Sequence, residues 1–272
     1  MPKITKITPA KKRKDRYHVY IDRGNGDEYA LSVSEDILIQ QKLWKDTELT
    51  EDRVIELRNK DEIDKAMQKT LNFLSYRMRS EVEIQRYLRD LEVDIAEEEI
   101  SQMIDKLKKL DFLDDQRFAE AFVRTKRDAH KKGPLVIKQE LLQKGVDKKI
   151  IEAAMEEYSK ELQLDTAIKM VEKKQSSYKK EGEKKKEQKL VQFLIQRGFD
   201  QTTAYEAIRY AEIETDHEAE AEELAKQAEK AWRKHSQKDL WERKQRTKQY
   251  LYSRGYSMEL IEKWFENLNE EE

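Results

Sequence analysis

The sequence contains no cysteine and, among its 272 residues, only three prolines and seven glycines. The missing thiols exclude disulfides, thiolate nucleophiles and metal sites built from cysteine. Because Pro and Gly are the residues that most often end helices, their scarcity predicts long helices. No run of about 18 apolar residues is present, and the first residues lack the apolar core of a signal peptide. We therefore expect a soluble, cytoplasmic protein without a membrane segment.

The chain also lacks a large excess of charge of one sign. Charged residues make up 41% of it and apolar residues 37%, yet the formal net charge is only −2. Disordered chains usually combine low hydrophobicity with a large net charge, so this balance favours a folded protein. The low apolar fraction predicts thin layers of helices, each burying one stripe and exposing a charged face.

The first segment has the period of a β-hairpin. Apolar side chains alternate with more polar ones on both sides of the sequence RGNGD, at Tyr17, Val19, Ile21, Tyr29, Leu31 and Val33. Gly24 and Gly26 would supply the positive φ angles of the turn. Ile4 and Ile7 are candidates for a further strand. With one short helix after Ser34 and another after Thr50, this N-terminal segment is assigned to residues 1–60.

From about residue 62 the apolar period changes to 3.6, and a short phrase recurs. QKGVD (143–147), QRGFD (196–200) and SRGYS (253–257) each place a basic residue, a glycine and an apolar residue before Asp or Ser. A leucine stands four residues before each glycine, so the predicted repeat junctions are Leu141, Leu194, Leu251, Gly145, Gly198 and Gly255. An earlier copy, YLRDLEVD (87–94), has Glu92 in place of the glycine.

The phrase has a physical explanation that requires no active site. A helix often ends in a left-handed residue, a conformation that costs a side chain with a Cβ about 1 kcal/mol or more. Lys144 would place positive charge near the negative pole of its helix, and Asp147 would cap the next helix. We therefore interpret each glycine as a corner between packed helices.

These patterns predict a mainly α fold, an array of four three-helix repeats after a small N-terminal β-hairpin extension. An apolar helix precedes each phrase and another follows it, which gives units of about 50 residues. The repeats are assigned to residues 61–113, 114–159, 160–214 and 215–272, the last with an acidic tail.

A search for catalytic or metal-binding constellations finds none. The histidines are scattered at His18, His130, His217 and His235, without the spacing of metal ligands. Asp114 and Asp115 are the only adjacent aspartates, and their position before an apolar stripe favours a helix cap over acid–base chemistry. We predict a protein that is not an enzyme and needs no cofactor or metal.

Charge is distributed unevenly along the chain. Basic residues concentrate in 3–16, 116–149, 173–189 and 226–249, and acidic ones in 92–100, 212–223 and 270–272. Each run alone is typical of a solvated helix face. Their recurrence along a repeat array favours a surface that faces a polyanion or a protein of mixed charge. The sequence pI of about 6.2 counts against a dedicated nucleic-acid binder.

Two stretches carry a family resemblance. LNFLSYRMRSEVEIQRYLRD (71–90) and LKKLDFLDDQRFAEAFVRTKRDAHKKGPLVIKQELLQKGVD (107–147) resemble the RecX family, regulators of the RecA recombinase. The residues that carry the resemblance are Tyr76, Arg77, Arg79, Ser80, Glu81, Leu113, Asp114, Asp115, Phe118, Ala119, Gly133, Glu140, Leu141, Lys144 and Gly145. The resemblance is specific over residues 62–157 and looser beyond them.

The resemblance implies an extended, curved stack of repeats lying in the groove of a RecA–single-stranded DNA filament. It implies a monomer that inhibits strand exchange, ATPase and the coprotease role in the SOS response and DNA repair. The candidate contacts to partner or DNA are Arg77, Arg79, Arg124, Arg127, Lys131 and Lys132. For Arg79, a role in orienting the helix junction stays open. The alternatives are a stand-alone nucleic-acid-binding repeat protein, with direct DNA contact, and a general protein-binding scaffold.

Overall fold

Three strands open the chain and pair side by side in sequence order. The computed structural model describes residues 2–11, 15–93, 95–178, 181–211 and 217–271. The strands β1 (Lys3–Pro9), β2 (Arg16–Asp22) and β3 (Asp27–Ser34) form an antiparallel sheet of order β1-β2-β3. The expected hairpin is therefore present, and the segment of Ile4 and Ile7 adds a third strand, with Ile4 opposite Ile21.

A bulge in β3 changes which of its side chains face the core. The pairing shifts after Val19 and Leu31, so that Tyr20 lies opposite Tyr29 and Ala30 is the extra residue. Ala30 is fully buried as a result, and Tyr29 is 54% exposed. The predicted alternation of Tyr29, Leu31 and Val33 therefore does not hold throughout β3, because a regular period does not anticipate an inserted residue.

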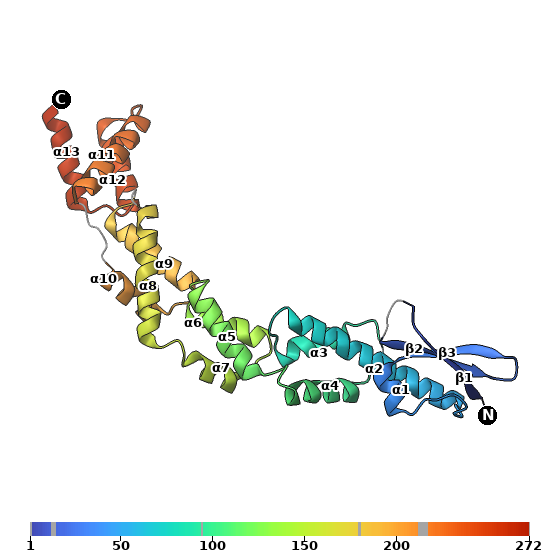
Figure 1. The fold of residues 1–272 in the computed structure, drawn as a ribbon. Helices are drawn as coiled ribbons and strands as arrows, with labels where there is room; N and C mark the ends of the chain where they lie inside the picture. Colours follow the sequence, from blue (N-terminus) through green and yellow to red (C-terminus); the bar gives the residue numbers. More distant parts are fainter. Residues whose placement is uncertain (1, 12–14, 94, 179–180, 212–216, 272) are drawn as a thin grey trace. The chain divides into compact units, whose positions relative to one another are not determined.

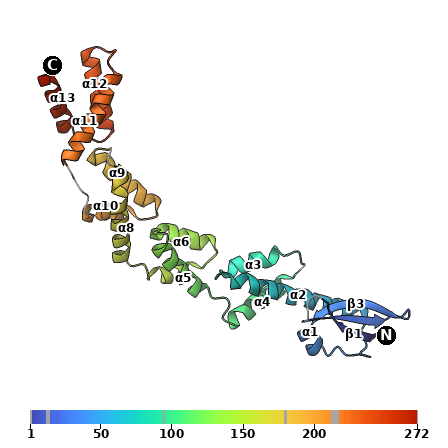
Figure 2. The same cartoon turned by 45° about the horizontal axis from the view of Figure 1, so that its top comes forward.

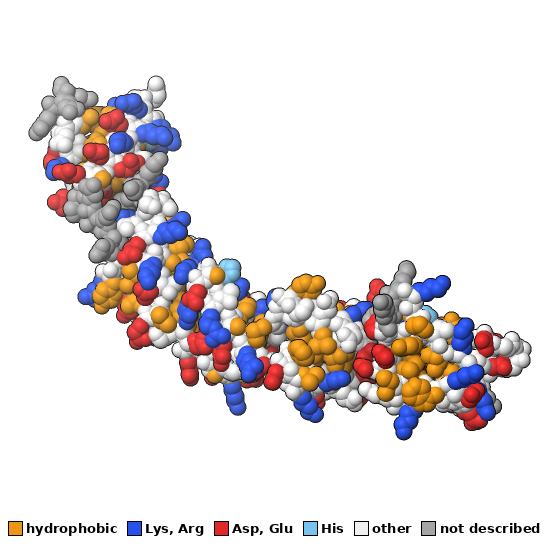
Figure 3. Space-filling model, viewed as in Figure 1, with side chains coloured by type: hydrophobic (Ala, Val, Ile, Leu, Met, Phe, Trp, Pro, Cys, Tyr) orange, Lys and Arg blue, Asp and Glu red, His pale blue; other side chains and the backbone are white. Residues whose placement is uncertain are grey.

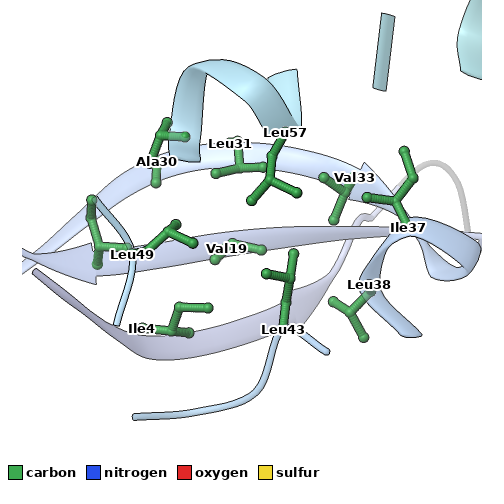
Figure 4. Close-up of a cluster of buried hydrophobic side chains, with 12 residues drawn as sticks. Ile4, Val19, Ala30, Leu31, Val33, Ile37, Leu38, Leu43, Leu49 and Leu57 are labelled. Carbon is green, nitrogen blue, oxygen red and sulfur yellow. The ribbon is translucent and has the colours of Figure 1, made fainter. Parts of the chain in front are cut away.

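The sheet is covered by the helices that follow it. The side chains of the sheet meet those of α1 (Glu35–Gln40), of the loop after it and of α2 (Glu51–Ser75), as Figure 4 shows for Leu31, Leu43 and Leu57. Ser34 and Thr50 cap these helices by accepting hydrogen bonds from Ile37 and Arg53 N–H.

The helix predicted after Thr50 continues without a break across the boundary assigned at residue 60. No Gly or Pro interrupts α2, so nothing ends the helix between Glu51 and Ser75. Its first half places Val54 and Leu57 in the core of the sheet. Its second half places Ala66 and Met67 in the core of the next three helices. The N-terminal sheet and the first repeat therefore share a helix.

From α2 onward, the helices of the described residues form four triplets. Their members are α2, α3 (Glu81–Arg89) and α4 (Glu97–Lys109); α5 (Asp115–Asp128), α6 (Pro134–Gln143) and α7 (Lys148–Met155); α8 (Lys160–Gln175), α9 (Glu183–Gln196) and α10 (Gln201–Tyr210); and α11 (His217–Lys234), α12 (Leu240–Ser253) and α13 (Met258–Glu271). A 3-10 turn, η1 (Ser176–Tyr178), follows α8. In each triplet a leucine of the middle helix is fully buried, at Leu88, Leu141, Leu194 and Leu251. The mainly α repeat fold is therefore confirmed.

The chain divides into two compact units. The first contains residues 1–118 and the corner Lys144–Val146, and the second contains residues 119–143 and 147–272. Within the second unit, α11, α12 and α13 lie together (Figures 1 and 2). Their core contains the aromatic side chains of Trp232, Tyr256 and Phe265. None of the described helices is both long and apolar enough to span a bilayer.

Candidate functional site

Among the described residues, one kind of contact between successive triplets recurs three times. In each, the first turn of a middle helix meets the glycine corner that ends the middle helix of the next triplet. We call joint 1 the contact of α3 with Lys144–Val146, joint 2 that of α6 with Arg197–Phe199, and joint 3 that of α9 with Arg254–Tyr256. The corner glycines have positive φ angles of 78°, 93° and 89°. Joint 1 lies within the first unit and joints 2 and 3 within the second.

The residue before the first turn bonds the carbonyl before the corner glycine. Ser80 Oγ donates to Lys144 O at 2.6 Å in joint 1. In joints 2 and 3 glycines take this place. Gly133 N–H donates to Arg197 O at 2.7 Å and Gly182 N–H to Arg254 O at 3.0 Å. The same contact therefore recurs three times with two kinds of donor.

The corners also leave no room for a side chain. A Cβ on Gly145 would lie 2.5 Å from Val82 Cγ2, one on Gly198 2.7 Å from Val136 N, and one on Gly255 2.5 Å from Lys185 N. Each corner therefore requires glycine for two physical reasons. Its backbone is left-handed, and the neighbouring helix approaches too closely for a Cβ atom. Only the left-handed conformation could be predicted from the sequence.

At two of the three joints, the free N–H group at the start of the middle helix is satisfied from the following triplet. In joint 1, Glu81 N–H donates to Asp115 Oδ1 at 2.8 Å. In joint 3, Glu183 N–H donates to Glu220 Oε1 at 3.2 Å. In joint 2 this position is Pro134, which has no N–H group and needs no acceptor. Asp114 caps its own helix α5 through Arg117 N–H, as predicted, whereas Asp115 serves the N-terminus of α3.

The joints explain why the first triplet has Glu92 where the others have glycine. Four triplets form three joints, and these use the corners of the second, third and fourth triplets. The corner after α3 belongs to none of them, so Glu92 has no docked helix end to avoid. At the other limit of the array, the first turn of α12 belongs to no joint, and Leu240 and Trp241 are 68% and 73% exposed.

Sequence reasoning gave no role to Gly133 and Gly182. A usable signal was the spacing, because Ser80 precedes Gly145 by 65 residues and Gly133 precedes Gly198 by the same 65.

The carboxylate of Glu83 organises the charges of joint 1. It accepts hydrogen bonds from Arg77 Nη2 and Lys144 Nζ, both at 2.9 Å, and from Ser80 N–H at 3.1 Å. Burial alone would raise the pKa of Glu83, but these hydrogen bonds outweigh it and lower the pKa to about 2. Arg77 is thus held by joint 1, although about half of its side chain is exposed.

Arg79 is engaged with an aromatic pair. Its guanidinium lies 3.3 Å from the ring centroid of Phe73, and that ring stacks on Tyr87 at 4.1 Å. Burial, and then the charge of Arg77, lower the pKa of Arg79. Cation–π contact of this kind fixes the α2–α3 loop (residues 76–80) against the helices.

Arg124 and Arg127 are both bound to Glu157, which follows α7. Arg124 Nη1 contacts the carboxylate and Arg127 Nη1 the backbone carbonyl, each at 2.7 Å. A hydrogen bond to Asp128 raises the pKa of Arg127. Both arginines therefore hold the end of the second triplet, and any partner would have to share them with Glu157.

Lys131 and Lys132 follow α5 in the same loop but differ in their surroundings. Lys132 pairs with Glu140, to which Lys126 also bonds at 3.3 Å. Burial would raise the pKa of Glu140, but these two lysines lower it. Lys131 has a φ of 51°, is exposed, and has no ion pair among the described residues. It is the most available cation of the predicted contacts.

The charged faces of the molecule are mixed. Figure 3 shows basic and acidic side chains interleaved over the described helices, with apolar side chains gathered over the N-terminal sheet domain. Parts of the predicted charge runs, residues 12–14, 94, 179–180, 212–216 and 272, lie outside the described residues. Glu270 and Glu271 continue α13, so the expected acidic tail is helical there.

Comparisons with known proteins match the whole length of the array. The family models that match are the regulatory protein RecX N-terminal domain at residues 2–50, the first three-helix domain of RecX at 66–112 and the second at 114–155. The third RecX three-helix domain matches twice, at 161–208 and 218–265.

Individual proteins that the chain resembles are also RecX proteins. The regulatory protein RecX of Oceanobacillus iheyensis is 39% identical, with 100% of both chains covered, and that of Bacillus cytotoxicus is 37% identical, with 96% of each covered. A crystal structure of regulatory protein RecX is 37% identical, with a TM-score of 0.64, covering 77% of this chain and 99% of its own. That of RecX from Lactobacillus salivarius is also 37% identical, with a TM-score of 0.52, covering 55% and 96%.

Proposed function

Because the chain belongs to the RecX family of regulatory proteins, we propose that it regulates the RecA recombinase by binding the RecA–single-stranded DNA filament. In this role it limits strand exchange, ATPase and coprotease activity and performs no catalysis itself. It acts in the cytoplasm as a monomer, and single-stranded DNA is reached through the filament.

The observation that supports this proposal is the threefold recurrence of one joint. A repeating chain offers a repeating partner several equivalent contacts, and linked contacts raise the overall affinity well above that of each one. Four triplets connected by a hydrogen bond to the same corner carbonyl and by the same glycine corner are suited to a polymer whose subunits also repeat.

Basic residues of the α2–α3 loop, of the C-terminal part of α5 and of the α5–α6 loop are the proposed contacts to the filament. They are Arg77, Arg79, Arg124, Arg127, Lys131 and Lys132. Lys131 is free to meet a phosphate directly. The others keep internal partners, and they contribute by holding the loops in position as well as by their charge.

The test is the ATPase and strand-exchange activity of preassembled RecA filaments with this protein added at substoichiometric amounts. We expect both activities to fall, because one chain contacts several subunits of the polymer. A parallel titration against bare single-stranded DNA over a salt series addresses the alternative. Tight binding with a steep salt slope, and unchanged RecA activity, would identify a stand-alone nucleic-acid binder instead.

A further inference from the structure

The α2–α3 loop exposes an aromatic side chain that takes no part in the packing of the fold. Tyr76 is 77% exposed, the highest value among the large hydrophobic side chains of the described residues, and Met78 is 47% exposed. Among the described residues, the side chain of Tyr76 makes no hydrogen bond, ion pair or ring contact. Both side chains project from the same short loop at the N-terminal side of joint 1.

The rest of the loop is fixed by internal contacts. Arg79 lies on the ring of Phe73, and Arg77 Nη1 donates to Met78 O at 3.0 Å while its Nη2 holds Glu83. Ser80 caps α3 through Glu83 N–H and bonds Lys144 O. Of the residues in the sequence YRMRS, the two arginines and the serine are used by the fold, whereas Tyr76 and Met78 are presented to solvent.

Such an arrangement is typical of an interaction hot spot. Holding the loop that carries an apolar side chain in place before binding reduces the entropy lost on binding. Tyr, Met and Arg are the residue types enriched at the centres of protein–protein interfaces. From this geometry we propose that Tyr76 and Met78 form an anchor that inserts into an apolar, acid-rimmed pocket on the protein surface of the partner.

The surroundings favour protein over nucleic acid as the occupant. Arg77 and Lys144 already share the carboxylate of Glu83, and Arg79 lies on an aromatic ring, so these cations are not free to neutralise phosphates. Met78 offers a flexible thioether that fills apolar pockets and does not pair with a base or a phosphate. Two cations around one carboxylate leave a local positive charge, which fits an acidic rim.

This inference rests on the proposed function, since the probe is the RecA–single-stranded DNA filament. The affinity of the full chain for the filament is measured for the wild type, Tyr76→Ala, Tyr76→Phe and Met78→Ala. Tyr252→Ala, at a side chain that is 58% exposed on α12, is the matched control. We expect Tyr76→Ala to weaken binding about 30-fold, as hot-spot truncation does, and Tyr76→Phe and Tyr252→Ala to change it less than about threefold.

Arg79→Ala tests the positioning role separately. It should weaken filament binding and speed amide exchange in residues 76–79. The free energy of unfolding of the rest of the chain should stay unchanged. If the wild type binds and Tyr76→Ala binds equally well, the anchor is refuted while the proposed function stands. If the wild type does not bind, the proposed function itself fails. An equal loss of affinity of Tyr76→Ala for bare single-stranded DNA would assign the loop to nucleic acid and overturn the protein pocket.

Discussion

Gly133 and Gly198 are in direct backbone contact, because a Cβ built on Gly133 would lie 2.2 Å from the carbonyl carbon of Gly198. The two residues belong to successive triplets, and Gly133 N–H bonds the carbonyl of Arg197 beside this contact. Gly182 and Gly255 repeat the relationship, with a Cβ on Gly182 2.4 Å from the carbonyl carbon of Gly255. Paired glycines therefore allow the close approach of helix end and corner at joints 2 and 3.

The first prediction concerns this contact. Gly133→Ala should destabilise joint 2 by about 3 kcal/mol, since the added methyl meets backbone that cannot move without opening the joint. Amide exchange in α6 and α9 should accelerate together. Gly24→Ala is the control, because Gly24 has a φ of 109° and open space around it. That variant should cost only about 1 kcal/mol of conformational strain, and equal effects of the two changes would refute the packing argument.

The second prediction is an acid sensitivity of joint 1. The folded pKa of Glu83, about 2, is below its ordinary value of 4.5. A carboxylate with a depressed folded pKa stabilises the fold fully above pH 4.5, and this stabilisation is lost as the pH falls from about 4.5 to about 2. Glu83→Gln should therefore lower the free energy of unfolding by about 2 kcal/mol at pH 7. The difference between the variant and the wild type should shrink toward pH 2. A gap that is independent of pH would argue against the ionised network.

The third prediction separates two adjacent aspartates. Asp115→Ala should leave Glu81 N–H unsatisfied and accelerate amide exchange at the start of α3, while Asp114→Ala should do so at the start of α5. Each loss should cost about 1 kcal/mol, the usual value of a helix cap. Identical exchange patterns in the two variants would contradict the different roles.

The fourth prediction compares cations near the α5–α6 loop. Arg127→Ala removes a bond to the carbonyl of Glu157 and should lower the free energy of unfolding by about 1–2 kcal/mol. Lys131→Ala should leave unfolding unchanged within about 0.5 kcal/mol. If Lys131 contacts the DNA backbone of the filament, its loss should reduce the salt slope of filament binding by about 1. An unchanged slope would remove Lys131 from the proposed contacts.

Much of the fold could be predicted because its signals are local. The 3.6 period, the leucines four residues before the glycines, and caps such as Asp114 and Asp147 depend on neighbours within one turn. The bulge at Ala30 and the continuous helix across residue 60 were missed. The bulge inserts a residue without any turn signal in the sequence. The helix is continuous only because no Gly or Pro interrupts it, and an absence of this kind is easily overlooked.

The sequence alone determined the helical triplets, their order and the left-handed corners, since these follow from periodicity and from the steric freedom of glycine. Only the tertiary structure decided what each corner touches. It assigned Asp115 to a helix from another triplet, placed Gly133 and Gly182 against the corners of the next triplets, and gave Arg77 and Arg79 internal partners. The physical reason is distance along the chain, because contacts between residues some 65 positions apart depend on how whole helices pack, and no local pattern encodes that packing.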